Sequence, residues 1–217
     1  GLHVSIAKTK FFMASLDYLG HTRIREGLTP CERNVEKILK VDVTDVKTVR
    51  SFIGMGLFYR KFIKFFSKRV DCLHKYLVKN ARVPRPLPPK EHEAVEFIKK
   101  ALSEYPVLRK PDFDQTFYLE TDGSSDGLGA ILMQKFGNKL HPIEYASTSI
   151  KPGQKKFSAD KLECLASAWG MCYFRNYLLG RSFILRTDNV VLKWLRNKTD
   201  KLGAIGSLKR RSTITRS

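Results

Sequence analysis

The 217-residue sequence predicts an α+β protein in which a mostly helical N-terminal part precedes a mixed β-sheet with helices. Between residues 44 and 66, apolar residues recur every three or four positions, as in an amphipathic helix. From residue 116 onwards apolar and polar residues alternate, as in β-strands. Residues 80–90 separate the two patterns and hold four prolines, which exclude a helix or a central strand there. We therefore expect two units joined near the prolines.

In the first unit, Phe11–Met13 and Tyr18–Ile24 read as strands of a hairpin. A helical stretch with a basic face follows from Thr44, whose side chain can cap its start. After the prolines, acidic residues open a helix over residues 91–105, which Pro106 ends.

The second unit reads as three strands in meander order, a long helix and a fourth strand. Along the first strand, Phe117, Leu119 and Thr121 share one face, and Tyr118, Glu120 and Asp122 share the other. The expected elements cover residues 117–122, 128–134, 140–147, 158–179 and 182–188.

The chain is strongly basic, with 40 Lys and Arg against 21 Asp and Glu. The excess is +12 in residues 1–90, zero in residues 91–192 and +7 in residues 193–217. Such an excess favours a polyanionic partner, either nucleic acid or an anionic membrane surface. Membrane docking is the weaker alternative, because the apolar face of each expected helix is needed for the core.

Other classes of protein are excluded by what the sequence lacks. No apolar run approaches the roughly 20 residues that a membrane span requires. The four cysteines form no Cys-x-x-Cys pair, which favours reduced thiols in an intracellular protein, cytoplasmic or nuclear.

Three carboxylates stand at the ends of expected elements. Asp122 ends the first strand, Glu163 lies in the first turns of the long helix, and Asp188 ends the fourth strand. A helix crossing between those strands would bring the three together, and converging carboxylates favour a hard cation such as Mg²⁺. Two such ions can support phosphodiester cleavage. From the residues alone, three unrelated surface carboxylates remain the alternative.

Several motifs around these carboxylates resemble the ribonuclease H domain of gypsy-type LTR retrotransposon Pol polyproteins. They are Tyr118–Ser124, Gly127–Gln134, Glu163–Ala166, Phe174–Arg181 and Arg186–Asn189. Upstream motifs resemble the end of the palm, the thumb and the connection of the reverse transcriptase of the same family. These are Tyr18–His21, Ser51–Gly56, Phe58–Ile63 and Pro106–Phe113.

The resemblance implies an organisation for the whole chain. Residues 1–80 would be the end of the palm and the thumb, residues 81–115 a proline-rich linker and connection helix, and residues 116–196 a ribonuclease H-like domain. The nucleic-acid partners would be a primer–template and an RNA–DNA hybrid. The implied nucleic-acid-binding residues are Leu19, Gly20, His21, Arg60, Lys61 and Lys64.

For the nuclease, the resemblance implies that Asp122, Glu163 and Asp188 hold Mg²⁺, for which Mn²⁺ can substitute, and that they cut the RNA strand. Two family features have no match: the Asp-Asp pair of the polymerase and a fourth nuclease Asp. We therefore expect an incomplete, C-terminally truncated fragment with a basic, disordered tail over residues 197–217. Its missing polymerase portion or a second subunit would be a partner.

These departures leave two functional readings. In the first, the chain is part of a reverse transcriptase and ribonuclease H, and it has little or no activity alone. In the second, it is a catalytically inactive basic remnant that binds nucleic acid.

Overall fold

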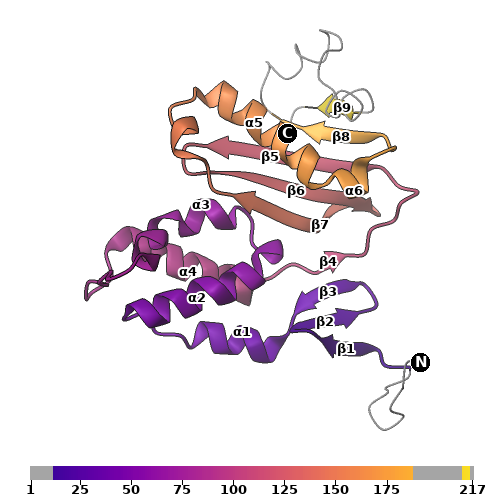
Figure 1. Cartoon of the computed structure of the whole chain (residues 1–217). Coiled ribbons are helices and arrows are strands. Elements are labelled where there is room, and N and C mark those ends of the chain that lie inside the picture. Colours follow the sequence, from indigo (N-terminus) through magenta and orange to yellow (C-terminus); the bar gives the residue numbers. More distant parts are fainter. Residues whose placement is uncertain (1–11, 188–211, 216–217) are drawn as a thin grey trace, which may run out of the picture.

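The computed structural model describes residues 12–187 and the backbone of residues 212–215. It contains a four-stranded sheet in the order β1-β2-β3-β4 and a five-stranded sheet in the order β7-β6-β5-β8-β9. The four-stranded sheet and helices α1 to α4 lie together as one body, and the five-stranded sheet stacks above it (Figure 1). The predicted α+β class is confirmed.

The first sheet is an antiparallel meander of β1 (Ser15–Tyr18), β2 (His21–Ile24) and β3 (Gly27–Pro30), which β4 (Leu108–Arg109) joins from far along the chain. The prediction of one strand over Tyr18–Ile24 was wrong, because the chain reverses within it. Leu19 and Gly20 form the turn with φ angles of 49° and 75°. Two successive positive φ angles are typical of the tight turn that matches the twist of a hairpin.

Within the described residues, the N-terminal body contains four α-helices and two 3₁₀ segments. They are α1 (Glu32–Leu39), α2 (Val46–Phe58), η2 (Arg60–Phe62), α3 (Phe66–Val70), η3 (Asp71–Leu77) and α4 (Pro89–Ser103). The sequence did not predict α1. The residue that caps α2 is Asp45 and not Thr44: Asp45 Oδ1 accepts from Thr48 N at 2.8 Å, and Thr48 Oγ1 accepts from Asp45 N at 3.0 Å. This reciprocal pair satisfies two backbone donors at the helix start.

Helix α4 belongs to the core of this N-terminal body. Its buried Val95, Ile98 and Leu102 pack in the same cluster as Phe52 of α2 and Phe66 of α3. The proline-rich segment therefore connects two helices of one core. Among the described residues, a second core begins only at β5.

The five-stranded sheet begins with the antiparallel strands β5 (Phe117–Ser124), β6 (Gly127–Phe136) and β7 (Lys139–Thr148). Helices α5 (Ala159–Tyr173) and α6 (Arg175–Leu178) then lead to β8 (Phe183–Arg186), which runs parallel to β5. This is the predicted order of elements. The long predicted helix is interrupted at Phe174, which caps α5 and is fully buried.

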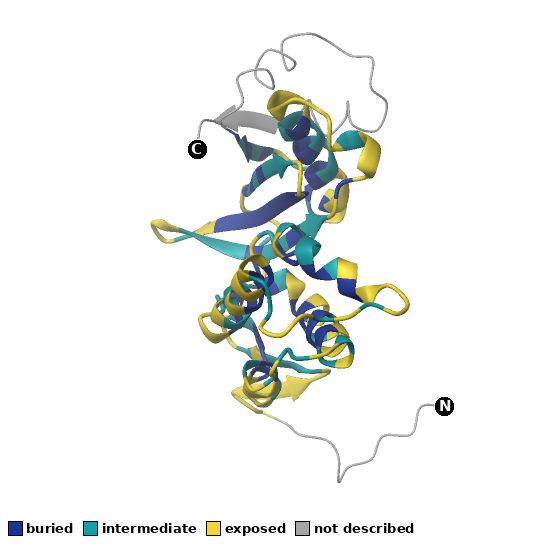
Figure 2. Cartoon of the chain, turned by 90° about the vertical axis from the view of Figure 1, so that its left-hand side faces the viewer, coloured by how far each residue is buried: buried dark blue, intermediate teal, exposed yellow. Residues whose placement is uncertain are grey.

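The two faces of this sheet have different covers. Helix α5 lies on one face, where Thr121 Oγ1 and Ser167 Oγ are 2.8 Å apart and both buried. Helix α3 lies against β6 and β7 on the other face, where Ser67 N donates to Ser147 Oγ at 2.9 Å. Strand β6, between β7 and β5, is consequently buried over its first eight residues (Figure 2).

Part of the predicted disordered tail is a strand. Ser212–Thr215 form β9, which pairs in parallel with β8 and covers the outer edge of that strand. Among the described helices, none is both long enough and apolar enough to cross a membrane.

Candidate functional site

The carboxyl end of β5 carries the first predicted site residue. Strand alternation turns Thr121 towards α5, and it turns Glu120 and Asp122 towards the face on which α3 lies. The Asp122 side chain is 39% exposed. Its carboxylate can therefore be reached from solvent although the strand itself is central in the sheet.

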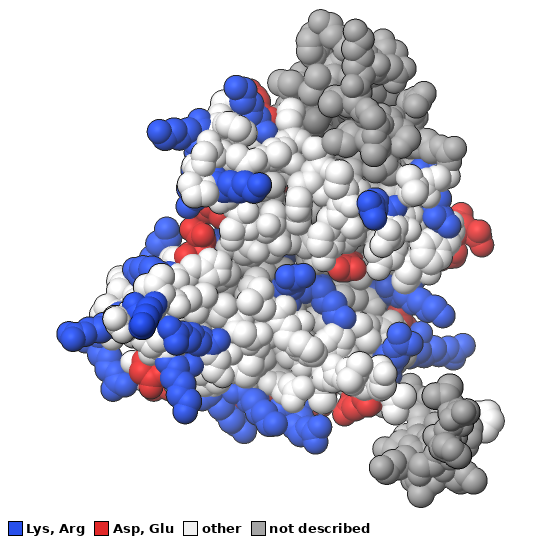
Figure 3. All heavy atoms as spheres, in the orientation of Figure 1, with Lys and Arg blue, Asp and Glu red and all other residues white. Residues whose placement is uncertain are grey.

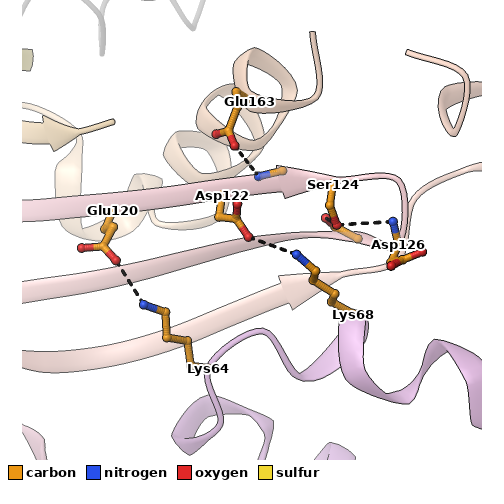
Figure 4. Close-up of polar contacts among 9 residues, drawn as sticks. Lys64, Lys68, Glu120, Asp122, Ser124, Asp126 and Glu163 are labelled. Carbon is orange, nitrogen blue, oxygen red and sulfur yellow. Dashed lines mark hydrogen bonds and ion pairs between the residues drawn. The ribbon is translucent and has the colours of Figure 1, made fainter. Parts of the chain in front are cut away.

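Helix α5 brings the second predicted residue to the same strand end. Glu163 Oε1 accepts a hydrogen bond from Gly123 N at 3.3 Å (Figure 4). The helix passes so close that a Cβ atom on Gly123 would lie 2.3 Å from Leu162 O. Gly123 therefore has to be a glycine for α5 to come close enough to place Glu163 at this strand end.

The third predicted residue, Asp188, lies outside the described residues. Strand β8 leads towards it and ends with Arg186 paired opposite Glu120 of β5. The structure therefore brings Asp122 and Glu163 to one strand end and leaves the position of Asp188 a prediction. Within residues 12–187, no group of three or more His, Cys, Asp or Glu side chains is arranged to hold a metal ion.

The donor set nevertheless fits a hard divalent cation in kind, because Asp122 and Glu163 offer carboxylate oxygens. Of the fold's described residues, these two are the ones that would hold such an ion. Positively charged side chains also lie at this end of β5.

Basic side chains from the N-terminal body lie beside the carboxylates of β5. Lys68 Nζ is 3.6 Å from Asp122 Oδ2, and Lys64 Nζ is 3.2 Å from Glu120 Oε1 (Figure 4). Arg186 of β8 lies 3.9 Å from the other oxygen of Glu120. Lys68 was not among the site residues predicted from the sequence. The available signal was the spacing of the charges in the sequence. Lys64 and Lys68 are four residues apart, and Glu120 and Asp122 are two residues apart on one face of a strand.

The predicted nucleic-acid-binding residues of the first hairpin differ in exposure. Leu19 is 75% exposed at the turn. The carbonyl oxygen of Gly20 accepts from the Tyr59 hydroxyl at 2.6 Å. The ring of His21 packs 5.0 Å from that of Phe58 and 5.7 Å from that of Phe62, so His21 anchors the hairpin on the helices.

Burial lowers the pKa of His21, an effect that the Gly20 backbone opposes and the charge of Lys61 reinforces. This histidine is therefore neutral at pH 7, and it contributes aromatic packing in place of positive charge.

The other three predicted nucleic-acid-binding residues lie on η2 and just after it. Arg60 is exposed, Lys61 is partly buried beside a cavity, and Lys64 pairs with Glu120. On the face drawn in Figure 3, Lys and Arg side chains outnumber Asp and Glu over the N-terminal body. The predicted basic surface is thus present over the N-terminal body.

A family model described as the RNase H-like domain found in reverse transcriptase matches residues 87–185. Residues 87–185 are an RNase H-like domain of the reverse transcriptase type. The match takes in α4, β4 and the five-stranded sheet as far as β8, so this RNase H-like domain includes a helix that packs in the N-terminal core.

Similar curated proteins are retrotransposon polyproteins. The retrovirus-related Pol polyprotein from transposon 297 of Drosophila melanogaster is 33% identical over 198 residues, which are 90% of this chain and 18% of that protein. The transposon Tf2-3 polyprotein of Schizosaccharomyces pombe is 33% identical over 82% of this chain and 13% of its own length. The chain therefore spans less than a fifth of the length of these relatives.

The fold also occurs in a solved structure, that of a foamy viral protease-reverse transcriptase in complex with RNA/DNA hybrid. The TM-score is 0.73 and the sequence identity 16%, over 98% of this chain and 30% of that one. Because the match covers almost the whole chain, the N-terminal body and the RNase H-like domain share the fold of one reverse transcriptase segment.

Proposed function

We propose that this chain binds RNA–DNA hybrid and uses Asp122, Glu163 and Asp188 to hold Mg²⁺ for cleavage of the RNA strand. The observation that carries the proposal is the hydrogen bond from Gly123 N to Glu163 Oε1, which holds Glu163 at the strand end that also carries Asp122. Asp122 and Glu163 are 41 positions apart in sequence, and the crossing of α5 over the sheet brings Glu163 to this end of β5.

Binding of the hybrid is supported by charge and by likeness. The first 90 residues carry an excess of 12 positive charges, and phosphate neutralisation by such a surface releases counterions. The similar foamy viral structure is a complex with RNA/DNA hybrid. The proposed contacts with primer–template and hybrid include Leu19 and Gly20 in the hairpin turn. They also include Arg60, whose side chain is exposed.

In the proposed reaction, each residue has a separate task. The metal ions, when bound, supply an activated water and stabilise the leaving oxygen. Asp122 would hold an ion from the strand and Glu163 from the helix, and the backbone N–H of Gly123 fixes the Glu163 carboxylate in reach of the strand end. Asp188 would complete the set from the segment after β8.

The test is cleavage of an end-labelled RNA–DNA hybrid by the full chain with Mg²⁺ or Mn²⁺, in parallel with Asp122→Asn and Glu163→Gln. Because the chain lacks a match for the fourth nuclease Asp, we expect weak cutting by the unmodified chain, which both variants lose while their hybrid affinity is kept. The matched control is Asp126→Asn, an exposed carboxylate in the next turn, which should cut normally. Cutting that survives Asp122→Asn would refute the assignment.

A second candidate function is hybrid binding without turnover, as in an inactive remnant. The observation in its favour is the Lys68 ammonium 3.6 Å from Asp122, since a fixed cation opposes a divalent metal at the same carboxylate. Hybrid binding that weakens steeply with salt, together with no cutting by the unmodified chain, would establish this function in place of the first.

A further inference from the structure

A cavity of about 430 Å³ lies between the two bodies, on the side of the molecule where β4 runs between β3 and β7 (Figure 1). Its walls come from β2, β3, η2, β4, β7 and α6, and they share no residue with the carboxylates of the candidate nuclease site. A volume of this size suits a small molecule or a short piece of a polymer.

The walls are dominated by positive charge. Five cationic side chains line the cavity from three separate segments, and a single carboxylate accompanies them, Glu144. The five are Arg23, Arg25, Lys61, Arg109 and Lys110. The lining therefore carries a formal charge of about +4, counting five cations and one anion.

The five cations share one feature, the lack of an ion pair with a described carboxylate. In the part of the chain that the structure describes, none of them forms an ion pair, whereas Lys64, Lys68 and Lys75 each do. The Glu144 carboxylate accepts from the hydroxyls of Tyr173 and Tyr177, each at 3.3 Å. Those hydroxyls hold the Glu144 carboxylate in place, and within the described residues the lining keeps a net positive charge.

The fold holds at least two of the cations in place. Lys61 is partly buried, and burial lowers its pKa; the Glu144 charge opposes this shift and the Arg23 charge adds to it. The Arg109 guanidinium lies 5.5 Å from the centre of the Phe136 ring. Side chains that packing holds in a cavity lose less freedom on binding than surface lysines do, which favours recognition of a ligand.

We propose that this cavity is a binding site for a phosphate-bearing anion, either a free polyphosphate or the phosphodiester backbone of a nucleic acid. Phosphate fits better than a carboxylate ligand, because three of the five cations are arginines and a guanidinium donates two parallel hydrogen bonds to phosphate oxygens. Several adjoining phosphates would be needed to balance a lining charge near +4.

The test is calorimetric titration of the full chain with inorganic tripolyphosphate. We expect one site per chain, and the double variant Arg23→Gln/Arg25→Gln should bind at least about tenfold more weakly, since each charge-assisted hydrogen bond contributes that order of affinity. Both arginines are exposed and their loss leaves the core intact. Arg82→Gln, an exposed arginine of the proline-rich segment outside the cavity, is the matched control and should bind normally.

A variant that is expected to strengthen binding keeps the proposal testable if another substitution unfolds the chain. Glu144→Gln removes the only negative charge of the lining and should bind tripolyphosphate several-fold more tightly, which misfolding cannot imitate. No saturable binding, or equal binding by the cavity variants and Arg82→Gln, would overturn the proposal. The readout is independent of nuclease activity.

The source of the phosphate is decided by competition. If an RNA–DNA hybrid displaces tripolyphosphate from the full chain, the cavity binds the backbone of a nucleic acid. If both ligands bind at once, the cavity is a site for a free polyphosphate.

Discussion

Lys68 Nζ lies 3.6 Å from Asp122 Oδ2, so a cation of the N-terminal body occupies the surroundings of the strand carboxylate that the metal would need. Both side chains are about one-third exposed, which leaves the pair partly screened by water. The contact couples the two bodies of the molecule at the candidate site. The Lys68 charge should therefore weaken the binding of a metal ion to Asp122.

Lys68→Met should tighten the binding of Mn²⁺ to the full chain by roughly two- to fivefold, because a partly exposed ion pair contributes about 0.2–1 kcal/mol. Mn²⁺ binding can be followed by electron paramagnetic resonance of the free ion. Lys79→Met, at an exposed lysine that forms no ion pair within the described residues, is the control and should leave the affinity unchanged. An unchanged Mn²⁺ affinity in Lys68→Met would mean that Asp122 is not a ligand of the metal.

The contact between the bodies depends on a glycine of β6. A Cβ atom on Gly129 would lie 1.9 Å from Cδ1 of the Phe65 ring, which leads into α3. Gly129→Ala should therefore lower the free energy of unfolding by about 1–3 kcal/mol, as overpacking does. Chemical denaturation measures the effect.

Two further variants identify the cause. Gly54→Ala lies in the middle of α2 with no atom within 4 Å of the added Cβ, so it should stabilise the chain by roughly 0.5–1 kcal/mol through helix propensity. Phe65→Ala should remove most of the cost of Gly129→Ala in the double variant. A fully additive double variant would mean that the clash is not with Phe65.

Stability should also depend on pH through His21. Because burial lowers the pKa of this imidazole, the folded chain binds fewer protons than the unfolded chain just below the ordinary histidine pKa of about 6.5. The contribution of His21 is complete above that pH and is lost as the pH decreases towards the lowered value. The midpoint of urea unfolding should thus be lower at pH 5.5 than at pH 7.5.

The histidine variant should flatten this dependence. His21→Phe keeps an aromatic ring against Phe58 and Phe62 and removes the titration. His92→Asn, at an exposed histidine of α4, should leave the pH dependence as it is. An equally steep dependence in His21→Phe would assign the effect to another group.

Much of the fold could be predicted from the sequence because its signals are local. Alternation placed Glu120 and Asp122 on one face of β5, and the crossing of the long helix brought Glu163 to the Gly123 backbone at the end of the same strand. The turn at Leu19 and Gly20 was missed because Leu at a positive φ is rare in a turn and does not signal one. The membership of α4 in the first core could not be predicted, since four prolines mark a break in secondary structure and not a break in packing.

The candidate site was predicted only in part for a similar reason. Element ends identify carboxylates that can converge, but they do not identify what packs against them. Lys68 reaches Asp122 across 54 positions of sequence through the docking of α3 on the sheet, which is tertiary information. The same holds for the cavity cations, which come from three segments that the fold alone assembles.

A buried hydroxyl pair ties α5 to the strand of Asp122. Thr121 Oγ1 and Ser167 Oγ lie 2.8 Å apart, and the two residues are 6% and 0% exposed. Ser167→Ala should lower the free energy of unfolding by about 1–3 kcal/mol, because it leaves the Thr121 hydroxyl buried without its partner. Thr121→Val together with Ser167→Ala should cost less than the sum of the single changes, by roughly 1 kcal/mol. Strict additivity in this cycle, measured by denaturation, would mean that the hydroxyls do not stabilise one another and that α5 is held on β5 by apolar packing alone.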